Sequence, residues 1–583
     1  MSWLLKCQVL RRASHSLRRP NALFGSGATN INPCFHSAAK PPGTEAGNTD
    51  WNKFDEFFSF TRGRFVVDEA SQMKRRYIKF DMNELVKIAA QSVGARYCAS
   101  VQKCPDGMYN KSFVLTMDDG QEVIAKVPNS NAGVRHYTTA SEVATMDFVR
   151  NTLQTPVPKV YAWSSRADNA IGAEYIIMEK MPGLQLSQVW NNMKIGDKMQ
   201  LRLNLALYQA KWLSISFCQF GALYYNEDLD KVRSKGHLYI NQKGEKVQDS
   251  RFAIGPMTGR DWCDCGRAAL QCDRGPWLTS SEYHKSIGLR ELMAMLSMKT
   301  LPKQTVMVCG PGLYQPSAAK KSAAIESYFN IYDALLPDDP TITAPILWHH
   351  DLHEENIFVD GKNPTKILGI IDWQSVDLLP LFDHNLEPAF VQYSGPKPET
   401  LEPPELEDTS GMSAEERARA TKKYFDRALY VASRRIANKK LPAAYHALEY
   451  QRTAAFDLLT IARRLFEFGE AHFQALTVEL RETWQELTSM KDSTTARQFP
   501  ITLDDESLAI IEDDYKKAIH GMEIMNDFKA RLGPLWPDKD AVSHDMYHDA
   551  KTALREMKDE VIQEFAKSQN DILEFEKLWP FDD

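Results

Sequence analysis

Two short apolar runs on either side of a cluster of turn residues form the clearest pattern in this chain. Residues 357–359 and 367–371 are apolar, and Asp-Gly-Lys-Asn-Pro begins directly after the first run. Apolar runs bounded by such residues are typical of paired strands, so we expect a β-hairpin. If the strands pair about residue 364, the turn proline, Asn356 lies opposite Asp372 at the open end of the hairpin.

Side-chain oxygens at that open end are suited to a metal ion that also takes phosphate oxygens. The amide of Asn356 and the carboxylate of Asp372 are hard ligands of the kind that Mg²⁺ prefers. Asp351 lies five residues before Asn356 in a loop rich in His and Glu, from which it could turn a carboxylate toward the same place. A solvated polar loop without chemistry is the alternative interpretation.

Strand-like segments earlier in the chain predict a small antiparallel sheet. Residues 112–117 and 122–127 flank Asp-Asp-Gly, which indicates a second hairpin. Alternation places Ile124 and Lys126 on one face of the second strand. A lysine on a nearly apolar strand needs an opposite charge, which a polyphosphate supplies. A lysine that extends from the strand end to solvent is the alternative.

Helical spacing from 141 to 153 follows this hairpin, with Glu142 near its start. Glu142 can pair with Lys126, or it can form a capping box with Thr139 and bind only backbone. The apolar run 174–181 then predicts a buried strand.

The second half of the chain has mostly helical periodicity. Residues 195–217 predict a long amphipathic helix, after which 226–280 has strand-and-turn character. Residues 394–413 are rich in Pro and acid and predict a surface loop. Further helices are expected at 414–438, 442–468, 471–490, 506–531 and 544–577.

Net charge, cysteine content and the length of apolar runs limit the classes of function that are possible for this chain. The net charge of −7 in 583 residues gives no general attraction to nucleic acid. Nine cysteines without regular spacing indicate a reduced compartment, and Cys263, Cys265 and Cys272 lack a fourth zinc ligand at a regular spacing. No run of eighteen apolar residues exists, so we expect no transmembrane segment.

The first 45 residues differ from the rest of the chain. They contain several Arg, Lys and Ser residues and no acidic residue before Glu45. Apolar residues such as Trp3, Leu4 and Leu5 lie close enough to form one face of a short helix. These features predict a disordered, cleavable mitochondrial transit peptide over 1–45 and therefore a mitochondrial location. A disordered basic tail is the alternative.

The pattern His349-x-Asp351-x₄-Asn356, followed by a strand ending at Asp372, resembles the catalytic core of the protein-kinase-like superfamily. Trp373 after this aspartate and the wording HHDLHEEN are similar to its aminoglycoside phosphotransferase and choline kinase branch. The resemblance implies that Asp351 accepts the substrate hydroxyl proton and that His349 supports the loop backbone. It also implies that Asn356 and Asp372 hold Mg²⁺.

The same resemblance assigns residues that bind ATP. Lys126 would hold the α- and β-phosphates, and Glu142 would orient Lys126, which favours the ion pair over the capping box. Gly107 and Asn110 match a loop that covers the phosphates, although a single glycine there fits an ordinary turn equally well.

Glu179 and Met181 stand where this superfamily places the hinge whose backbone contacts adenine. A plain core strand explains this segment nearly as well. The branch therefore implies a two-lobed α+β fold, with a small antiparallel-sheet N-lobe and an enlarged helical C-lobe. We expect the N-lobe with its extension at 46–183 and the C-lobe at 184–583, the latter containing the catalytic hairpin (346–373) and an insert (226–280).

The expected function is an ATP- and Mg²⁺-dependent phosphotransferase that acts on a hydroxyl of an unidentified small molecule in mitochondria. The leader, the insert and the helical tail are similar to fungal mitochondrial members of the branch. The alternative is a catalytically weak or inactive kinase-like protein that binds nucleotide, or acts as a scaffold, in mitochondrial maintenance. The single glycine of the phosphate loop favours this alternative, and the complete set of Lys126, Asp351, Asn356 and Asp372 opposes it.

Overall fold

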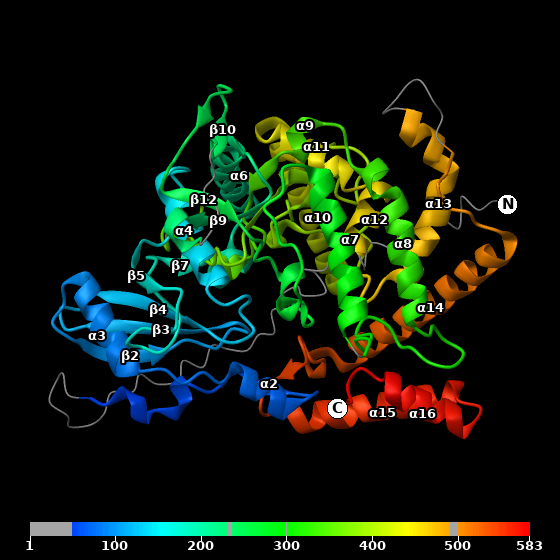
Figure 1. The fold of residues 1–583 in the computed structure, drawn as a ribbon, viewed down its shortest axis with the longest axis horizontal. Helices are drawn as coiled ribbons and strands as arrows, with labels where there is room; N and C mark the ends of the chain where they lie inside the picture. Colours follow the sequence, from blue (N-terminus) through cyan, green and yellow to red (C-terminus); the bar gives the residue numbers. More distant parts are fainter. Residues whose placement is uncertain (1–48, 230–235, 299, 490–497, 583) are drawn as a thin grey trace.

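The computed structural model describes residues 49–229, 236–298, 300–489 and 498–582. The expected leader, residues 1–45, lies outside this range. A small lobe built on a sheet lies beside a larger helical lobe (Figure 1). This arrangement confirms the predicted two-lobed α+β fold class.

The N-lobe contains a five-stranded antiparallel sheet whose outer strands are β2 and β5. In pairing order its strands are β2 (Cys98–Lys103), β3 (Asn110–Met117), β4 (Glu122–Pro128), β6 (Tyr175–Glu179) and β5 (Val160–Ser164). Apolar residues of β3 and β4 form one core with helix α3 (Met82–Val93). The predicted hairpin is present, and Gly120 adopts the positive φ of 85° that its turn requires.

Helix α4 (Tyr137–Asn151) lies between the lobes. Phe148 contacts Phe217 and Phe252 of the C-lobe, with ring centroids 5.4 Å apart in each pair. The helix starts before the predicted residue 141, so Thr139 lies inside it rather than at its N-cap. Thr139 Oγ1 donates a hydrogen bond to Glu174, 2.6 Å away, which excludes the capping box.

The C-lobe helices surround a core of large aromatic side chains. Trp212 is fully buried and packs edge-on against Trp348 and Trp373, with ring centroids 5.3 and 5.6 Å apart. The helices are α5 (Leu186–Val189), α6 (Ile195–Trp212), α7 (Ser280–Ser297), α8 (Ala318–Leu335), α9 (Pro340–Thr343), α10 (Ala414–Lys440), α11 (Pro442–Tyr450), α12 (Ala454–Ala462) and α13 (Glu470–Ser489). The predicted helix 442–468 is thus divided, because Thr453 caps a new helix through the amide of Phe456.

The insert contributes strands to the C-lobe instead of projecting from it. Strand β12 (Phe252–Gly255) extends a sheet that contains β9 (Gly221–Tyr225), β16 (Asp377–Pro380) and β13 (Pro345–Leu347). Strands β10 (Tyr239–Asn241) and β11 (Lys246–Val247) join β8 (Ile215–Phe217). The prediction of helix through residue 217 was therefore wrong, since β8 pairs with the insert.

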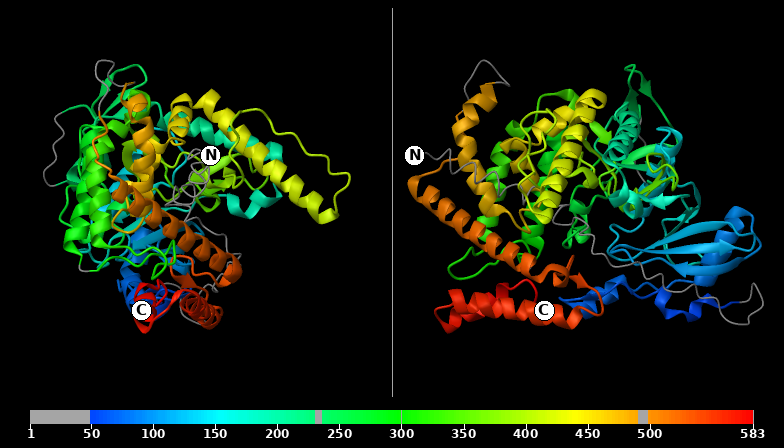
Figure 2. Two further views of the ribbon diagram at one scale, coloured as in Figure 1. Left: turned by 90° about the vertical axis from the view of Figure 1, so that its right-hand side faces the viewer. Right: turned by 180° about the vertical axis from the view of Figure 1, so that it is seen from behind.

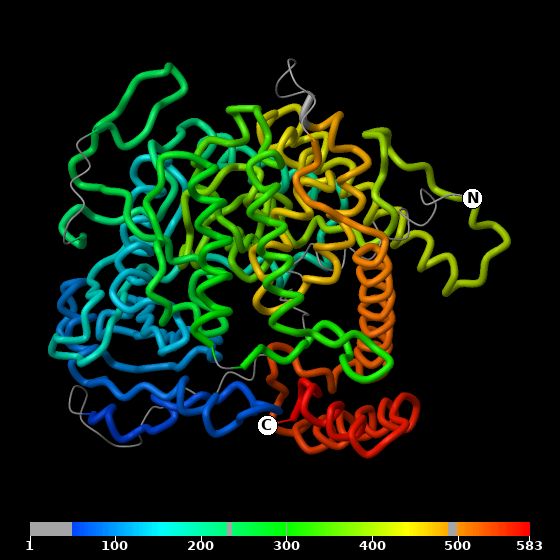
Figure 3. Tube along the Cα trace, turned by 45° about the vertical axis from the view of Figure 1, so that its right-hand side comes forward, coloured from blue at the N-terminus to red at the C-terminus, as the bar shows by residue number. Residues whose placement is uncertain are grey.

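The two ends of the described chain meet. Strand β1 (Arg64–Phe65), next to α2 (Glu69–Arg76), pairs with β17 (Ala541–Val542). Figures 2 and 3 show this N-terminal segment beside the C-terminal helices. Those helices are α14 (Asp505–Leu532), α15 (Tyr547–Phe565) and α16 (Gln569–Leu578). No helix among the described residues is long and apolar enough to cross a membrane.

Candidate functional site

The catalytic hairpin is formed by β14 (Ile357–Val359) and β15 (Ile367–Ile370). Ile357 pairs with Ile370, and the amide of Ile371 donates to the carbonyl of Asn356 at 3.0 Å. Asn356 is therefore opposite Ile371, and the predicted register was wrong by one residue. At the turn Val359 pairs with Ile367, so the strands pair about residue 363 there and not about 364. The register shift between Phe358 and Val359 leaves one extra residue in β15, which moves the open end one position back toward the predicted register.

Asp372 still reaches the open end of the hairpin because its backbone turns there. Its φ of 62° lies in the left-handed region, which is uncommon for a residue other than glycine. The turn brings the carboxylate of Asp372 to 3.1 Å from the ammonium group of Lys126. Backbone strain at this position is thus associated with a contact between the lobes.

His349 supports the loop that carries Asp351. Its ring is fully buried against Trp373, with centroids 4.7 Å apart. Nε2 lies 2.9 Å from the carbonyl of Ile371, and Nδ1 accepts the amide of Asp351 at 3.2 Å. Burial lowers the pKa of His349 to about 4, so the ring is neutral near pH 7 and fits this donor and acceptor pattern.

The carboxylate of Asp351 is about half exposed, with 52% of its side chain accessible. His353 Nε2 lies 3.5 Å from it, while His353 Nδ1 accepts the amide of Glu355. Burial alone would raise the pKa of Asp351, but the hydrogen bond from His353 lowers it below its usual value. Asp351 is therefore ionised at neutral pH. The sequence reasoning did not assign a role to His353.

Asn356 is buried beside Asp351 in the short helical turn η7 (Glu354–Asn356). Its Nδ2 donates to the carbonyl of Asp351 at 3.0 Å and lies 3.1 Å from His353 Nε2. These contacts orient the amide, and its Oδ1 accepts no hydrogen bond from a described residue.

Lys126 connects the two lobes. Its ammonium lies 2.7 and 3.0 Å from the two oxygens of Glu142 on α4 and 3.1 Å from Asp372. Burial opposes the charge, but the carboxylates of Asp372 and Glu142 outweigh it and raise the pKa of Lys126 to about 12. The lysine thus stays protonated next to the catalytic hairpin.

The oxygen donors fit a magnesium ion that keeps external ligands. Asn356 Oδ1 and the Asp372 carboxylate are hard donors at the same end of the hairpin. The Asp372 carboxylate, 43% of whose side chain is exposed, lies next to Lys126. Within the described ranges no group of three His, Cys, Asp or Glu residues could hold a metal by itself. Mg²⁺ commonly binds through one or two protein ligands together with substrate phosphates, which suits this donor set.

Gly107 lies in the loop between β2 and β3, and Asn110 is the first residue of β3. Gly107 is exposed, and its φ is not in the positive region that would require glycine. Asn110 Nδ2 donates to Gln374 Oε1 at 2.6 Å, two residues beyond Asp372. The structure therefore brings Asn110 to the catalytic segment through Gln374, a residue that the sequence did not single out.

Arg260 of the insert contacts Tyr109, at the end of the same loop. The guanidinium of Arg260 lies 3.8 Å from the ring centroid of Tyr109 and donates to the carbonyls of Asn131 and Ala132, each at 3.1 Å. The next residue, Asp261, accepts from Arg464 at 2.9 Å. The insert thus connects the loop of the N-lobe to the C-lobe. Arg267 of the insert is fully buried and pairs with Glu291 and Glu467.

The predicted hinge passes close to the hairpin. Glu179 accepts Arg150 at 3.2 Å and the amide of Lys159 at 3.0 Å, so its side chain braces β5 and β6. Met181 is buried against Gly369 of β15, where a Cβ would come within 2.4 Å of the Met181 side chain. The segment therefore joins the lobes next to the site, and its contact with adenine stays a prediction.

Asp383 follows the hairpin in the chain and has a buried side chain. Asp383 lies 2.6 Å from Arg463 Nη2 and 3.1 Å from His284 Nε2. Burial raises the pKa of Asp383, but the positive charge of Arg463 outweighs it and lowers the pKa below its ordinary value. These contacts fit a structural role for Asp383 within the C-lobe.

Comparison with known proteins identifies the segment around the hairpin. Residues 312–383 match the profile described as the phosphotransferase enzyme family. A subtelomeric hrmA-associated cluster protein of Aspergillus fumigatus is 33% identical over 342 residues, which cover 54% of this chain and 64% of that protein. The chain thus spans just under two thirds of that relative's length.

Yeast relatives match over a longer range. The altered inheritance of mitochondria protein 9 of Lachancea thermotolerans is 27% identical over 466 residues, which cover 73% of this chain and 72% of that protein. The protein of the same name from Eremothecium gossypii is 26% identical over 565 residues, with 83% and 88% covered.

Two solved structures have distant similarity. The macrolide 2′-phosphotransferase of Brachybacterium faecium is 13% identical, with 68% of this chain and 96% of that chain covered, at a TM-score of 0.28. A ternary complex of APH(2″)-IIa with streptomycin and ATP is 13% identical, with 73% and 100% covered, at a TM-score of 0.30. The comparisons confirm the resemblance found in the sequence: the chain has the signature of the phosphotransferase enzyme family at 312–383 and is similar over most of its length to the altered inheritance of mitochondria protein 9 of yeasts.

Proposed function

We propose that this protein transfers the γ-phosphoryl group of ATP to a hydroxyl of a small molecule, with Mg²⁺ as cofactor. One observation carries the proposal. Lys126, buried in the N-lobe sheet, contacts Asp372, which is 246 residues away in the chain and ends the catalytic hairpin. Asp351 and Asn356 precede the same hairpin and supply further oxygens.

The residues have separate roles in this reaction. Mg²⁺-bound ATP supplies the phosphoryl group and neutralises charge on it. Lys126 binds phosphate oxygens and is oriented by Glu142, while Asn356 and Asp372 offer oxygens to the metal. Asp351, ionised and accessible, orients the acceptor hydroxyl and accepts its proton. Positioning and electrostatics would account for most of the rate, since no covalent intermediate is needed.

The loop between β2 and β3 favours a second candidate function. It has only one glycine, so its backbone is less flexible than that of a glycine-rich loop. Gln374 contacts Asn110, and Arg260 contacts Tyr109, and these contacts hold the segment in place. A loop of this kind fits a protein that binds nucleotide as a scaffold in mitochondrial maintenance, without efficient turnover.

An acceptor screen with Asp351→Asn separates the two candidates. We expect wild type to transfer phosphate from Mg²⁺-ATP to at least one hydroxyl compound and the variant to be about 10³-fold slower, with nucleotide binding unchanged. Asp360→Asn is the matched control, because Asp360 accepts only turn amides of Lys362 and Asn363. Equal background transfer by wild type and Asp351→Asn, despite ATP binding, would favour the scaffold.

We also propose a mitochondrial location, which the names of the yeast relatives support. The full chain fused to a fluorescent protein should enter mitochondria, and the chain without residues 1–45 should not. Import of the shortened chain would show that the leader is not the signal.

A further inference from the structure

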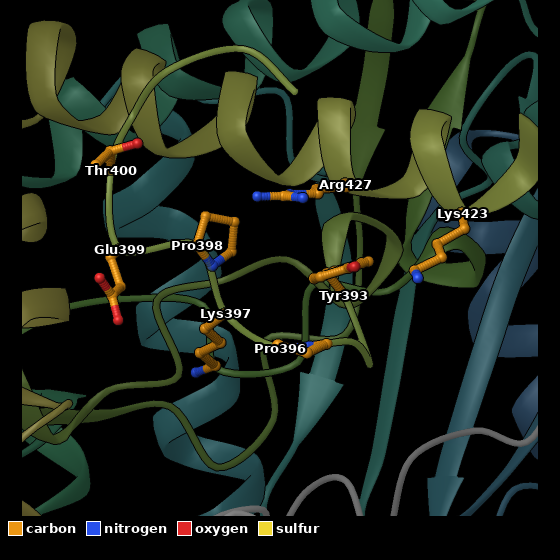
Figure 4. Close-up of a pocket in the computed structure, with 8 residues that line it drawn as sticks. All are labelled: Tyr393, Pro396, Lys397, Pro398, Glu399, Thr400, Lys423 and Arg427. Atoms are coloured by element: carbon orange, nitrogen blue, oxygen red, sulfur yellow. The ribbon is translucent and has the colours of Figure 1, made fainter. Parts of the chain in front are cut away.

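A cavity of about 380 Å³ lies between helix α10 and the loop that leaves the catalytic segment. This volume is in the range of small-molecule sites. The residues that line it are Tyr393, Pro396, Lys397, Pro398, Glu399, Thr400, Lys423 and Arg427. Figure 4 shows Lys423 and Arg427 leaving α10 on the side of the loop that carries Tyr393 and Lys397.

The loop is attached to the catalytic loop at its start. The amide of Ala389 donates to the carbonyl of Leu352 at 2.9 Å, and Asn385 Nδ2 donates to the carbonyl of His350 at 3.3 Å. Leu352 and His350 flank Asp351. Tyr393 is four residues beyond Ala389, a distance that an extended chain spans in at most about 14 Å. These two hydrogen bonds attach the segment that leads to the cavity to the residues on either side of Asp351.

The cavity is positively charged. Three of its side chains are cationic and one, Glu399, is anionic. Two of the other basic residues of α10 have acidic partners: Lys422 pairs with Asp426, and Arg434 pairs with Glu449. Lys423 and Arg427 form no ion pair with any carboxylate among the described residues, and the carboxylate of Glu399 points away from Arg427 (Figure 4).

We propose that this cavity binds the anionic group of the acceptor, and that the substrate class is a small soluble hydroxyl compound with a phosphate or carboxylate. The inference rests on the proposed phosphotransferase function and specifies its substrate. Arg427 offers a planar fork that pairs with two oxygens of such a group, and Lys423 adds a point charge. An acceptor with several positive charges is repelled from the same place. The hydroxyl to be phosphorylated then lies toward Asp351.

Binding tests the cavity without turnover. The full chain is loaded with Mg²⁺ and a non-hydrolysable ATP analogue, so that the nucleotide site is filled, and is titrated with glycerol 3-phosphate, ribose 5-phosphate, glycerol and choline. We expect the two phosphate esters to bind with Kd values of about 1 mM or tighter and to bind more weakly at high salt. Lys423→Gln/Arg427→Gln should weaken this binding about tenfold.

The matched control is Arg419→Gln/Lys422→Gln, which removes two exposed charges of α10 outside the cavity lining. It should bind the esters like wild type. Equal binding to all three proteins, no ester binding up to about 10 mM, or preference for choline overturns the proposal. So does binding that requires anionic lipid vesicles instead of the soluble esters.

Turnover distinguishes this proposal from the proposed function. Transfer to an anionic acceptor that falls about tenfold in the cavity variant, and not in the control, supports both. Transfer that depends on Asp351 but is equal in the cavity variant keeps the phosphotransferase and rejects the cavity as its acceptor site.

Discussion

The catalytic hairpin and the loop between β2 and β3 meet at Gln374, but different kinds of contact hold them in place. The hairpin is organised by near neighbours: His349 binds the Ile371 carbonyl and the Asp351 amide, and Asn356 binds the Asp351 carbonyl. The loop depends on distant residues, with Gln374 lying 264 positions from Asn110. The hairpin side of the site is therefore held by its own residues, whereas the side formed by the loop depends on the packing of the C-lobe and the insert.

This difference has a consequence for mutation. Under the proposed function, changes in the hairpin should reduce phosphate transfer directly, because its side chains would bind the metal and the acceptor hydroxyl. Changes in the loop or the insert should alter the affinity for nucleotide, because they shift the loop and leave the side-chain oxygens of the hairpin in place. The following predictions test this contrast.

The largest effect is expected from the hairpin. Asp372→Asn removes an anionic oxygen and should reduce phosphate transfer about 10²- to 10³-fold and raise the Mg²⁺ concentration needed for half-maximal rate. Steady-state kinetics across a magnesium titration measures both changes. Asn363→Ala in the hairpin turn is the control, and an Asp372→Asn enzyme with normal magnesium dependence would contradict the assignment.

The buried pair between the lobes should matter for stability. Lys126→Met leaves the carboxylate of Glu142 buried without its cation and should lower the free energy of unfolding by about 3 kcal/mol in urea titrations. Lys126→Met/Glu142→Leu should recover much of this loss, because it removes both charges. If the double variant is as unstable as the single one, the charge imbalance is not the cause.

The hairpin should also be sensitive to acid. The folded pKa of His349, about 4, is below the unfolded value of 6.5, so the unfolded chain takes up the proton first. The contribution of His349 is therefore complete above about pH 6.5 and is lost as the pH falls through 6.5 toward 4, by at most about 3 kcal/mol. Urea titrations of wild type and His349→Gln at pH 7 and 4.5 should show a smaller pH difference in the variant. An equal difference would place the acid sensitivity elsewhere.

The smallest effect is expected at the loop. Arg260→Ala removes the contact with Tyr109 and should raise the KM for ATP about fivefold with little change in kcat. Lys246→Ala, an exposed charge elsewhere in the insert, is the control. A large fall in kcat with an unchanged KM would show that the insert acts on the hairpin instead.

Local signals explain which elements could be predicted. The turn residues between 359 and 367 specified the hairpin, although the strands pair about residue 363 at the turn and the register at the open end differs by one residue from the prediction. Asp81 is the N-cap of α3, where its side chain accepts the amide of Glu84, a local capping signal of the same kind. The start of α4 was missed because its residues are buried between the lobes, where packing outweighs the capping signal at Thr139.

The sequence by itself determined the parts of the site that lie close together in the chain. His349, Asp351, Asn356 and Asp372 fall within 24 residues, so turn and strand patterns were enough to bring them together. Only the tertiary structure decided the contacts of Lys126 with Asp372, Asn110 with Gln374 and Arg260 with Tyr109. The physical reason is that backbone propensity and turn chemistry act over a few residues, whereas contacts between distant residues depend on how the apolar cores of the two lobes pack.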